Sequence, residues 1–192
     1  TRQRGAGGHV RTAVERPTLP LHVEVRRASG LRVRGVPVGA RGLDVAALAA
    51  TGADAILATP AHQMPLGVAL APAARTALLD WAADRAGRVV IEDDYDAEFR
   101  YDRRPLGALQ GRAPERVAYL GSASKTLAPG LRLGWLLLPA QLVEPVRDKK
   151  QLDDGGSGVL DQLALARLLD GDADDRHRRL ARRRNRLRAS RR

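Results

Sequence analysis

The chain has 192 residues, of which 44% are hydrophobic, enough apolar material to bury the core of a large domain. It contains no cysteine, which excludes disulfides, thiolate metal ligands and a catalytic thiol within this sequence. No apolar run approaches the roughly 20 residues that a helix needs to cross a bilayer, and no apolar export segment follows the N-terminal arginines. We therefore expect a globular, cytoplasmic protein without a membrane partner.

The net charge of +11 is concentrated toward the two ends of the sequence. Residues 176–192 contain ten arginines and no acidic residue. Such a tail has the charge needed to contact the phosphate backbone of nucleic acids. A solvated, arginine-rich helix gives the same pattern, and we favour that interpretation. A basic nucleic-acid-binding module is kept as an alternative function.

The predicted elements alternate between helices and strands along most of the chain. Residues 1–10 are polar and glycine-rich without periodicity, so we expect an irregular segment there. Beyond them, the pattern predicts helices at residues 20–30, 42–50, 72–87, 139–150, 159–169 and from 176 onward, and strands at residues 31–38, 54–60, 88–94, 117–122 and 131–139. This alternation is typical of a three-layer α/β fold, in which a mostly parallel sheet has helices on both faces.

The predicted strand at residues 88–94 leads into a dense group of acids in the segment IEDDYDAEFRYD. If the strand stays extended, Asp93 and Tyr95 share one face, because side chains alternate along a strand. This pair suits a heteroaromatic cofactor, since a carboxylate can keep a pyridine nitrogen protonated and a phenol can hydrogen-bond a ring oxygen. A carboxylate cluster for Mg²⁺ and phosphoryl chemistry, or a purely structural cluster, are the alternatives.

A loop of small residues around one lysine, GSASKTLAPGLRLGW, follows the strand at residues 117–122. Its small residues let the backbone approach a ligand, Ser122 and Ser124 offer hydroxyls to a phosphate, and Arg132 could add a bidentate contact. Lysine occurs at three positions against thirty arginines, and unlike arginine it can act as an amine nucleophile. Lys125 is therefore the candidate for covalent chemistry. The spacing of a nucleotide P-loop is absent.

The third strand end is ATPAHQMPLG, in which two prolines and a glycine predict a tight loop around His62. A lone histidine in a loop is more often a hydrogen-bonding residue than a ligand. His62 is therefore a weaker candidate for a ligand contact than Asp93 or Lys125.

Together these segments resemble the fold-type I pyridoxal-phosphate (PLP) enzymes of aminotransferase class I and II. The resemblance is closest to the aminotransferase-like domain of MocR-type transcriptional regulators of the GntR superfamily. It is carried by RPTLPLHVEVRRASGLRVRGVPV, ATPAHQMPLG, IEDDYDAEFRYDRRPLGALQG and YLGSASKTLAPGLRLGWLLLP. It implies PLP as the cofactor and an incomplete copy of the large domain of this fold, with its central part at residues 11–150. Residues 151–192 would be the helical, arginine-rich start of the connection to a small domain.

The resemblance also assigns roles to the candidate residues. Lys125 would bind the cofactor covalently and be the catalytic residue, Asp93 would pair with the pyridine nitrogen, and Tyr95 would contact the ring hydroxyl. The cofactor phosphate would be held by the side chains of Ser122, Ser124 and Arg132. His62 would lie beside the ring. No metal site is implied.

The function expected from this resemblance is a PLP-binding, effector-sensing domain of a MocR/GntR-type regulator. A fragment of a catalytic class I/II aminotransferase and an inactive remnant are the alternatives, so whether the chain is an enzyme stays open. Members of this regulator class begin with a winged helix-turn-helix and a linker that do not precede Thr1, so we expect a truncated copy. The implied partners are a small amino compound, a second subunit in a homodimer, and DNA through a missing N-terminal domain or weakly through the arginine tail.

Overall fold

The computed structural model describes residues 10–96, 107–127, 129–169 and 182. Within these residues, seven strands form a sheet with the order β3-β2-β1-β4-β5-β6-β7. The strands are β1 (Arg11–Arg16), β2 (Arg32–Gly39), β3 (Gly42–Leu43), β4 (Ala55–Ala58), β5 (Val89–Asp93), β6 (Val117–Ser122) and β7 (Gly134–Leu137). The helices are α1 (Pro20–Ala28), α2 (Val45–Ala50), α3 (Pro72–Ala83), α4 (Ala123–Thr126), the 3-10 helix η2 (Pro129–Leu131), α5 (Ala140–Asp154) and α6 (Val159–Leu169).

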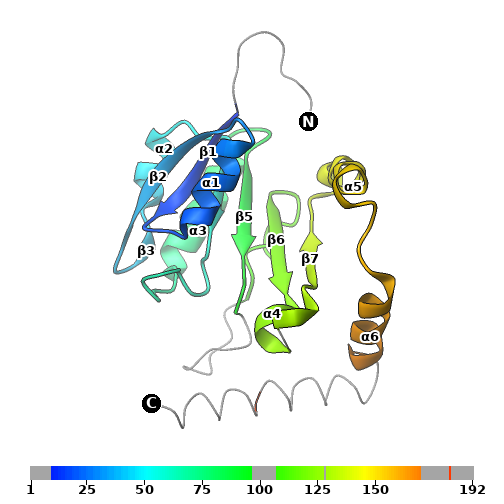
Figure 1. The fold of residues 1–192 in the computed structure, drawn as a ribbon. Coiled ribbons are helices and arrows are strands. Elements are labelled where there is room, and N and C mark those ends of the chain that lie inside the picture. Colours follow the sequence, from blue (N-terminus) through cyan, green and yellow to red (C-terminus); the bar gives the residue numbers. More distant parts are fainter. Residues whose placement is uncertain (1–9, 97–106, 128, 170–181, 183–192) are drawn as a thin grey trace. The chain divides into compact units, whose positions relative to one another are not determined.

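The expected α/β architecture with a mostly parallel sheet is confirmed. Strand β1 pairs in parallel with β2 and β4, and β4, β5 and β6 continue the parallel ladder. Strand β3 pairs with β2 in the antiparallel direction, and the arrow of β7 points opposite to that of β6 in Figure 1. Helix α1 lies on one face of this part of the sheet, and α2 and α3 lie on the other (Figure 1).

Strand β1 was not predicted, although it lies inside the sheet. Four of its six residues are buried, and two of those, Thr12 and Glu15, are polar. A strand with neighbours on both sides and helices over both faces loses the alternation of apolar and polar residues. Because two of its buried residues are polar, the sequence of β1 shows no hydrophobic pattern typical of a strand.

Several element boundaries differ from the predicted ones. Gly42 and Leu43 form β3 instead of opening a helix, and α2 starts after Asp44, whose carboxylate accepts a hydrogen bond from Ala47 N at 2.9 Å. The predicted long strand at residues 131–139 is reduced to β7, because η2 ends only at Leu131 and Arg132 then adopts a positive φ of 52° that interrupts an extended strand. In contrast, α5 extends to Asp154, beyond its predicted end.

The hydrophobic core gathers apolar side chains from α2, α3 and the central strands. Its fully buried members include Leu48, Ile56, Leu78 and Val90, each with 0% exposure. Trp81 of α3 joins them at 5% exposure, and the guanidinium of Arg88 lies 4.8 Å from the centroid of its indole ring. These contacts explain why the apolar face of α3 faces the sheet.

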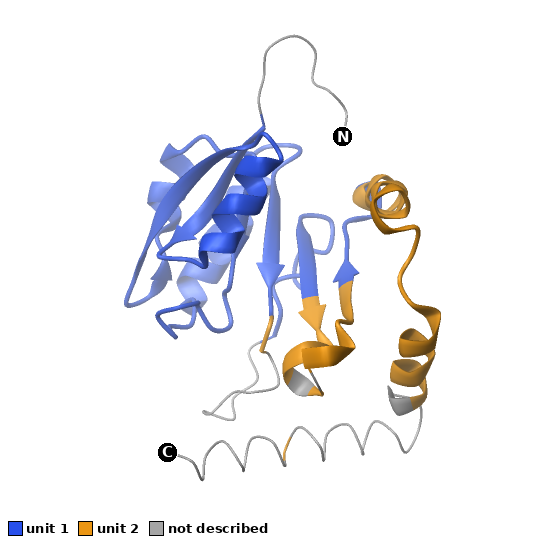
Figure 2. Ribbon diagram, viewed as in Figure 1, with its two compact units in different colours: residues 1–94, 106–120, 136–141 blue, residues 95–105, 121–135, 142–192 orange. Residues whose placement is uncertain are grey.

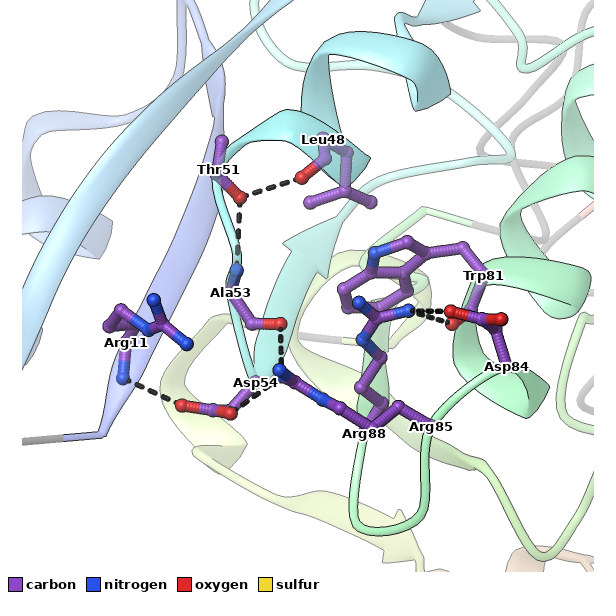
Figure 3. Close-up of polar contacts among 9 residues, drawn as sticks. All are labelled: Arg11, Leu48, Thr51, Ala53, Asp54, Trp81, Asp84, Arg85 and Arg88. Carbon is purple, nitrogen blue, oxygen red and sulfur yellow. Dashed lines mark hydrogen bonds and ion pairs between the residues drawn. The ribbon is translucent and has the colours of Figure 1, made fainter. Parts of the chain in front are cut away.

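A polar network ties the amino end of β1 to the connection between α3 and β5 (Figure 3). The carboxylate of Asp54 accepts a hydrogen bond from Arg11 N at 3.1 Å and pairs with Arg85 Nη2 at 2.6 Å. The same guanidinium donates to Ala53 O at 2.9 Å. Asp54 therefore joins three segments that are distant in the sequence.

The chain divides into two compact units (Figure 2). Unit 1 comprises Thr1–Asp94, Leu106–Leu120 and Leu136–Gln141, and unit 2 comprises Tyr95–Pro105, Gly121–Trp135 and Leu142–Arg192. The arginine tail expected from residue 176 onward lies outside the described residues, except for Arg182. Within the described part of the chain, no helix combines the length and the apolar character needed to cross a membrane.

Replacing Asp54 by alanine should lower the free energy of unfolding by about 1–2 kcal/mol, because Arg11 N and the Arg85 guanidinium lose a charged acceptor. Asp84→Ala is the matched control. Its carboxylate also pairs with an arginine, Arg88, but its side chain is 75% exposed, so the loss should stay below about 1 kcal/mol. Urea denaturation of both variants measures the difference. Equal losses would contradict the role given to Asp54.

Candidate functional site

Asp93 is the last residue of β5, at the carboxyl end of the parallel strands, where ligands bind in open α/β sheets. Its carboxylate Oδ2 lies 3.7 Å from Nε2 of His22 on α1, and the two side chains are 20% and 18% exposed. The other ring nitrogen of His22, Nδ1, lies 3.2 Å from the hydroxyl of Thr18. Helix α1 therefore places a histidine beside the predicted cofactor carboxylate.

The surroundings of Asp93 affect the charges on α1. Burial lowers the pKa of His22, and the positive charge of Arg26 lowers it further. Burial also lowers the pKa of Arg26, while the negative charge of Asp93 opposes that shift. Arg26 also donates from Nη1 to His22 O at 2.8 Å, within the same helix. A neutral imidazole and a cation thus lie near the Asp93 carboxylate.

A second carboxylate, Glu15, is buried at the carboxyl end of β1, with 4% exposure. Its Oε2 atom accepts hydrogen bonds from Thr59 N at 3.2 Å, from Thr59 Oγ1 at 2.6 Å and from Gln63 Nε2 at 3.3 Å. Burial raises the pKa of Glu15, the hydrogen bonds from Thr59 and Gln63 lower it, and the charge of Asp93 adds a smaller upward effect. Three polar residues are therefore buried together under the loop that carries His62.

His62 lies in the loop between β4 and α3 and is half-buried. The adjacent Gln63 is buried at 2% exposure, and its backbone N and O form hydrogen bonds with Val68 O and Gly67 N. Gly67 has a φ of +74°, and a Cβ atom there would lie 3.4 Å from Nε2 of His62. The loop is thus tight, as predicted, and leaves room for the imidazole.

Unit 2 contains Ser122, Ser124 and Lys125 at the junction of β6 and α4. Ser122 caps the short helix, because its Oγ accepts a hydrogen bond from Ser124 N at 3.1 Å. Lys125 is exposed, and its amine makes no hydrogen bond or ion pair with any residue that the structure describes. The amine is therefore accessible for reaction, and both serine hydroxyls lie within the same turn.

Gly121 and Arg132 of unit 2 each have a distinctive local environment. A Cβ atom at Gly121 would lie 2.2 Å from Nε1 of Trp135, so the absence of a side chain here leaves room for the indole. Arg132 adopts a φ of 52°, which is uncommon for a residue with a side chain, and lines a cavity of about 770 Å³ together with Trp135, Lys150 and Asp161.

The expected extended run from Asp93 to Tyr95 is wrong. Strand β5 ends at Asp93, and Tyr95 lies in a turn, so alternation along a strand does not place these two side chains on one face. The remaining acids differ in their roles: Glu92 is buried at 1% exposure and accepts hydrogen bonds from Leu109 N and Gln110 N at 2.9 and 3.0 Å. Among the described residues, no three histidine or acidic side chains gather as metal ligands would.

In unit 1, Asp93 and His62 follow the carboxyl ends of the neighbouring parallel strands β5 and β4. The other predicted site residues belong to unit 2: Tyr95, Ser122, Ser124, Lys125 and Arg132. Sequence reasoning missed His22, Arg26 and Glu15. A usable signal was Thr18, two residues before the proline that starts α1, because a hydroxyl in that position can contact a side chain in the first helical turn. The burial of Glu15 had no such signal.

The amino-acid pattern of a known family matches nearly the whole chain. The model of the family described as aminotransferase class I and II matches residues 6–192. The chain belongs to this aminotransferase family. The fold agrees, because LysN, an α-aminoadipate aminotransferase from Thermus thermophilus, superimposes with a TM-score of 0.81. That structure is 30% identical and covers 91% of this chain, which in turn covers 46% of LysN.

Curated relatives with this aminotransferase-like part include transcriptional regulators. An HTH-type regulator of Bacillus subtilis, YhdI, is 42% identical over 120 residues, which is 62% of this chain and 25% of the regulator. The pyridoxine biosynthesis transcriptional regulator PdxR of Corynebacterium glutamicum is 34% identical over 163 residues, which is 85% of this chain and 36% of PdxR. The expected resemblance to regulators with an aminotransferase-like domain is confirmed, and the chain spans less than half the length of these relatives.

The buried carboxyl of Glu15 should make stability depend on pH. Its pKa is raised by burial above the ordinary value of 4.5, so the folded state keeps the proton longer than the unfolded state as the pH rises. Its contribution to stability is complete below about pH 4.5 and is lost as the pH rises through the folded pKa. The free energy of unfolding should therefore fall less steeply with rising pH in Glu15→Gln than in the wild type. Urea titrations between about pH 4 and pH 8 measure both slopes, and equal slopes would sink this expectation.

Proposed function

We propose that this chain binds PLP and forms the effector-sensing part of a MocR/GntR-type transcriptional regulator. The observation that carries the proposal is Asp93 at the carboxyl end of a central parallel strand, with a histidine from α1 beside it. The exposed amine of Lys125, in a turn that also holds two serine hydroxyls, is the second support. These are the side chains that a phosphorylated pyridine aldehyde requires. The residues present therefore fit the cofactor.

Asp93 would hold the pyridine nitrogen. When bound, PLP supplies an electron sink whose strength depends on a protonated ring nitrogen. The Asp93 carboxylate is suited to keeping that proton, since it carries a negative charge and remains partly exposed at the strand end. His22 would keep the carboxylate in place. Because its pKa is lowered, its imidazole would not compete as a cation with the protonated ring nitrogen for the Asp93 carboxylate.

Lys125 would hold the cofactor aldehyde through its amine and, once released, move a proton as a base. Ser122, Ser124 and Arg132 would bind the phosphate through hydroxyl and guanidinium donors. Tyr95 would donate to the ring hydroxyl, and His62 would lie against the ring. LysN provides a precedent for the ligand class, since it was crystallised with N-(5'-phosphopyridoxyl)-L-leucine.

The regulator assignment is supported by the similarity to YhdI and PdxR, both HTH-type transcriptional regulators. In the intact protein we propose that an N-terminal domain binds DNA, that the subunits form a homodimer, and that a small amino compound is the effector. A catalytic aminotransferase is the second candidate. It is favoured by 31% identity over 119 residues to aromatic-amino-acid aminotransferase 1 of Thermococcus litoralis.

The three lysines allow a direct test of the cofactor lysine. Incubation with PLP followed by borohydride should attach one pyridoxyl group, which peptide mass spectrometry should locate on Lys125, because this amine is exposed and unpaired among the described residues. Lys125→Ala should lose the label. Lys149→Ala and Lys150→Ala are matched controls that keep it, since both amines pair with acids, Asp153 and Asp154. A label that persists in Lys125→Ala would remove the central assignment.

Asp93→Asn should weaken PLP binding by about tenfold, because an amide cannot stabilise a protonated ring nitrogen as a carboxylate does. Asp94→Asn is the control. Asp94 is the next residue, and its Oδ2 already accepts a hydrogen bond from the Tyr119 hydroxyl at 3.0 Å. Absorbance titration with PLP measures both dissociation constants. Equal weakening in the two variants would refute the pairing of Asp93 with the ring nitrogen.

Sensor and enzyme can be separated by supplying amino compounds to the PLP-loaded chain together with a keto acid. A sensor should change its absorbance spectrum with one amino compound and form no new amino acid. An aminotransferase should release amino acid continuously, which chromatography detects. Turnover well above that of free PLP would favour the second candidate.

A further inference from the structure

The carboxylate of Glu15 is not among the residues that the proposed function uses, yet it is one of the most deeply buried charged groups of unit 1. One of its oxygens, Oε2, accepts hydrogen bonds from both the backbone and the hydroxyl of Thr59, and from the side-chain amide of Gln63. All of these donors belong to the segment that follows β4. Glu15 therefore fixes a loop that starts 44 positions further along the chain.

The side chain of Gln63 connects Glu15 to other parts of the loop. Its amide nitrogen also lies 2.9 Å from Pro17 O and 2.7 Å from Met64 O, and its amide oxygen accepts from Leu66 N at 3.0 Å. The Thr59 hydroxyl, which donates to Glu15, lies 3.3 Å from Met64 N. The side chains of Glu15, Thr59 and Gln63 thus bind the loop backbone at Thr59, Met64 and Leu66.

The position of His62 follows from that of its neighbour. Gln63 is held inward with 2% exposure, whereas His62 stays half-buried with its Nε2 over Gly67. If Gln63 lost its hydrogen bond to Glu15, the backbone hydrogen bonds that join Gln63 to Gly67 and Val68 would lose part of their support from inside the protein. The imidazole would then lose the surface against which it lies.

We propose that Glu15 is a positioning residue for His62, which it holds through Thr59 and Gln63 in the place where the imidazole meets the ring of the bound cofactor. The half of this inference that concerns the cofactor rests on the proposed function. The half that concerns the loop does not. Glu15 itself would touch neither the cofactor nor a substrate.

Glu92 provides the matched control for a purely structural role. It is also a buried glutamate of the central sheet, at 1% exposure, and it also accepts hydrogen bonds from another segment, at Leu109 N and Gln110 N. Burial raises the pKa of both carboxyls. Glu92 does not contact the loop at residues 59–67 through any hydrogen bond recorded for the described chain. Loss of either glutamate should therefore destabilise the fold, but only loss of Glu15 should disturb His62.

The test compares Glu15→Ala, Glu15→Gln and Glu92→Ala by amide hydrogen exchange and by the nitrogen-15 spectrum of the His62 ring, in the complete chain without PLP. In Glu15→Ala, the amides of Gln63, Leu66 and Gly67 should exchange at least about tenfold faster, and the His62 signals should move toward those of an unstructured histidine. Glu15→Gln should restore most of the protection, since its amide oxygen can accept the same hydrogen bonds. Glu92→Ala should affect Leu109 and Gln110 and leave the loop unchanged.

Identical loop exchange and His62 signals in Glu15→Ala and Glu92→Ala would overturn the inference. If Glu15→Ala does not fold, Thr59→Val takes its place, because it removes the hydroxyl at 2.6 Å while keeping the shape of the side chain. It should move the same amides and the same His62 signals by a smaller amount. Unchanged signals in this variant would equally overturn the inference.

PLP titration separates this inference from the proposed function. If the wild type binds PLP, Glu15→Ala and His62→Ala should raise the dissociation constant by similar factors, and the double variant should be no worse than either. Additive losses would show that Glu15 does not act through His62. If the wild type does not bind PLP, the proposed function fails, and the exchange measurement still decides whether Glu15 positions the loop.

Discussion

Two carboxylates buried in the central sheet impose the constraint on which the surrounding loops depend. A buried charge without hydrogen-bond donors costs several kcal/mol, so the chain around Glu15 and Glu92 has to supply them. For Glu15 the donors come from the loop after β4, and for Glu92 they come from the backbone at Leu109 and Gln110. The conformation of both connections is therefore set from inside the sheet. Each of these connections follows a strand of the parallel sheet, the first β4 and the second β5.

Helix α1 is relevant to the candidate site because it lies beside Asp93 at the carboxyl end of β5. None of the residues of α1 is fully buried, so the helix contributes little to the core. It contributes instead the His22 and Arg26 side chains, which reach the region of Asp93. A carboxylate that must stay charged at a partly buried strand end is stabilised by a nearby cation. Helix α1 thus places an imidazole and a guanidinium near the carboxylate that we propose as the partner of the pyridine nitrogen.

Membership of the aminotransferase family and similarity to transcriptional regulators are compatible with each other. Holding a pyridine ring requires the same carboxylate, lysine and phosphate donors whether the bound cofactor reacts repeatedly or reports the presence of an amine. The chain covers less than half of each of these relatives, so both activities are proposals for the intact protein.

The sequence by itself determined the α/β class, most of the strands and helices, and the family. It also singled out Asp93 and Lys125 as candidates, because scarce lysine and local periodicity are visible without contacts. It did not reveal β1, the turn at Tyr95 or the Trp135 indole that fills the space beside Gly121, since these depend on what packs against each residue. The burial of Glu15 and the approach of His22 to Asp93 were decided only by tertiary structure. Both join segments dozens of residues apart, and no local pattern encodes a contact at that separation.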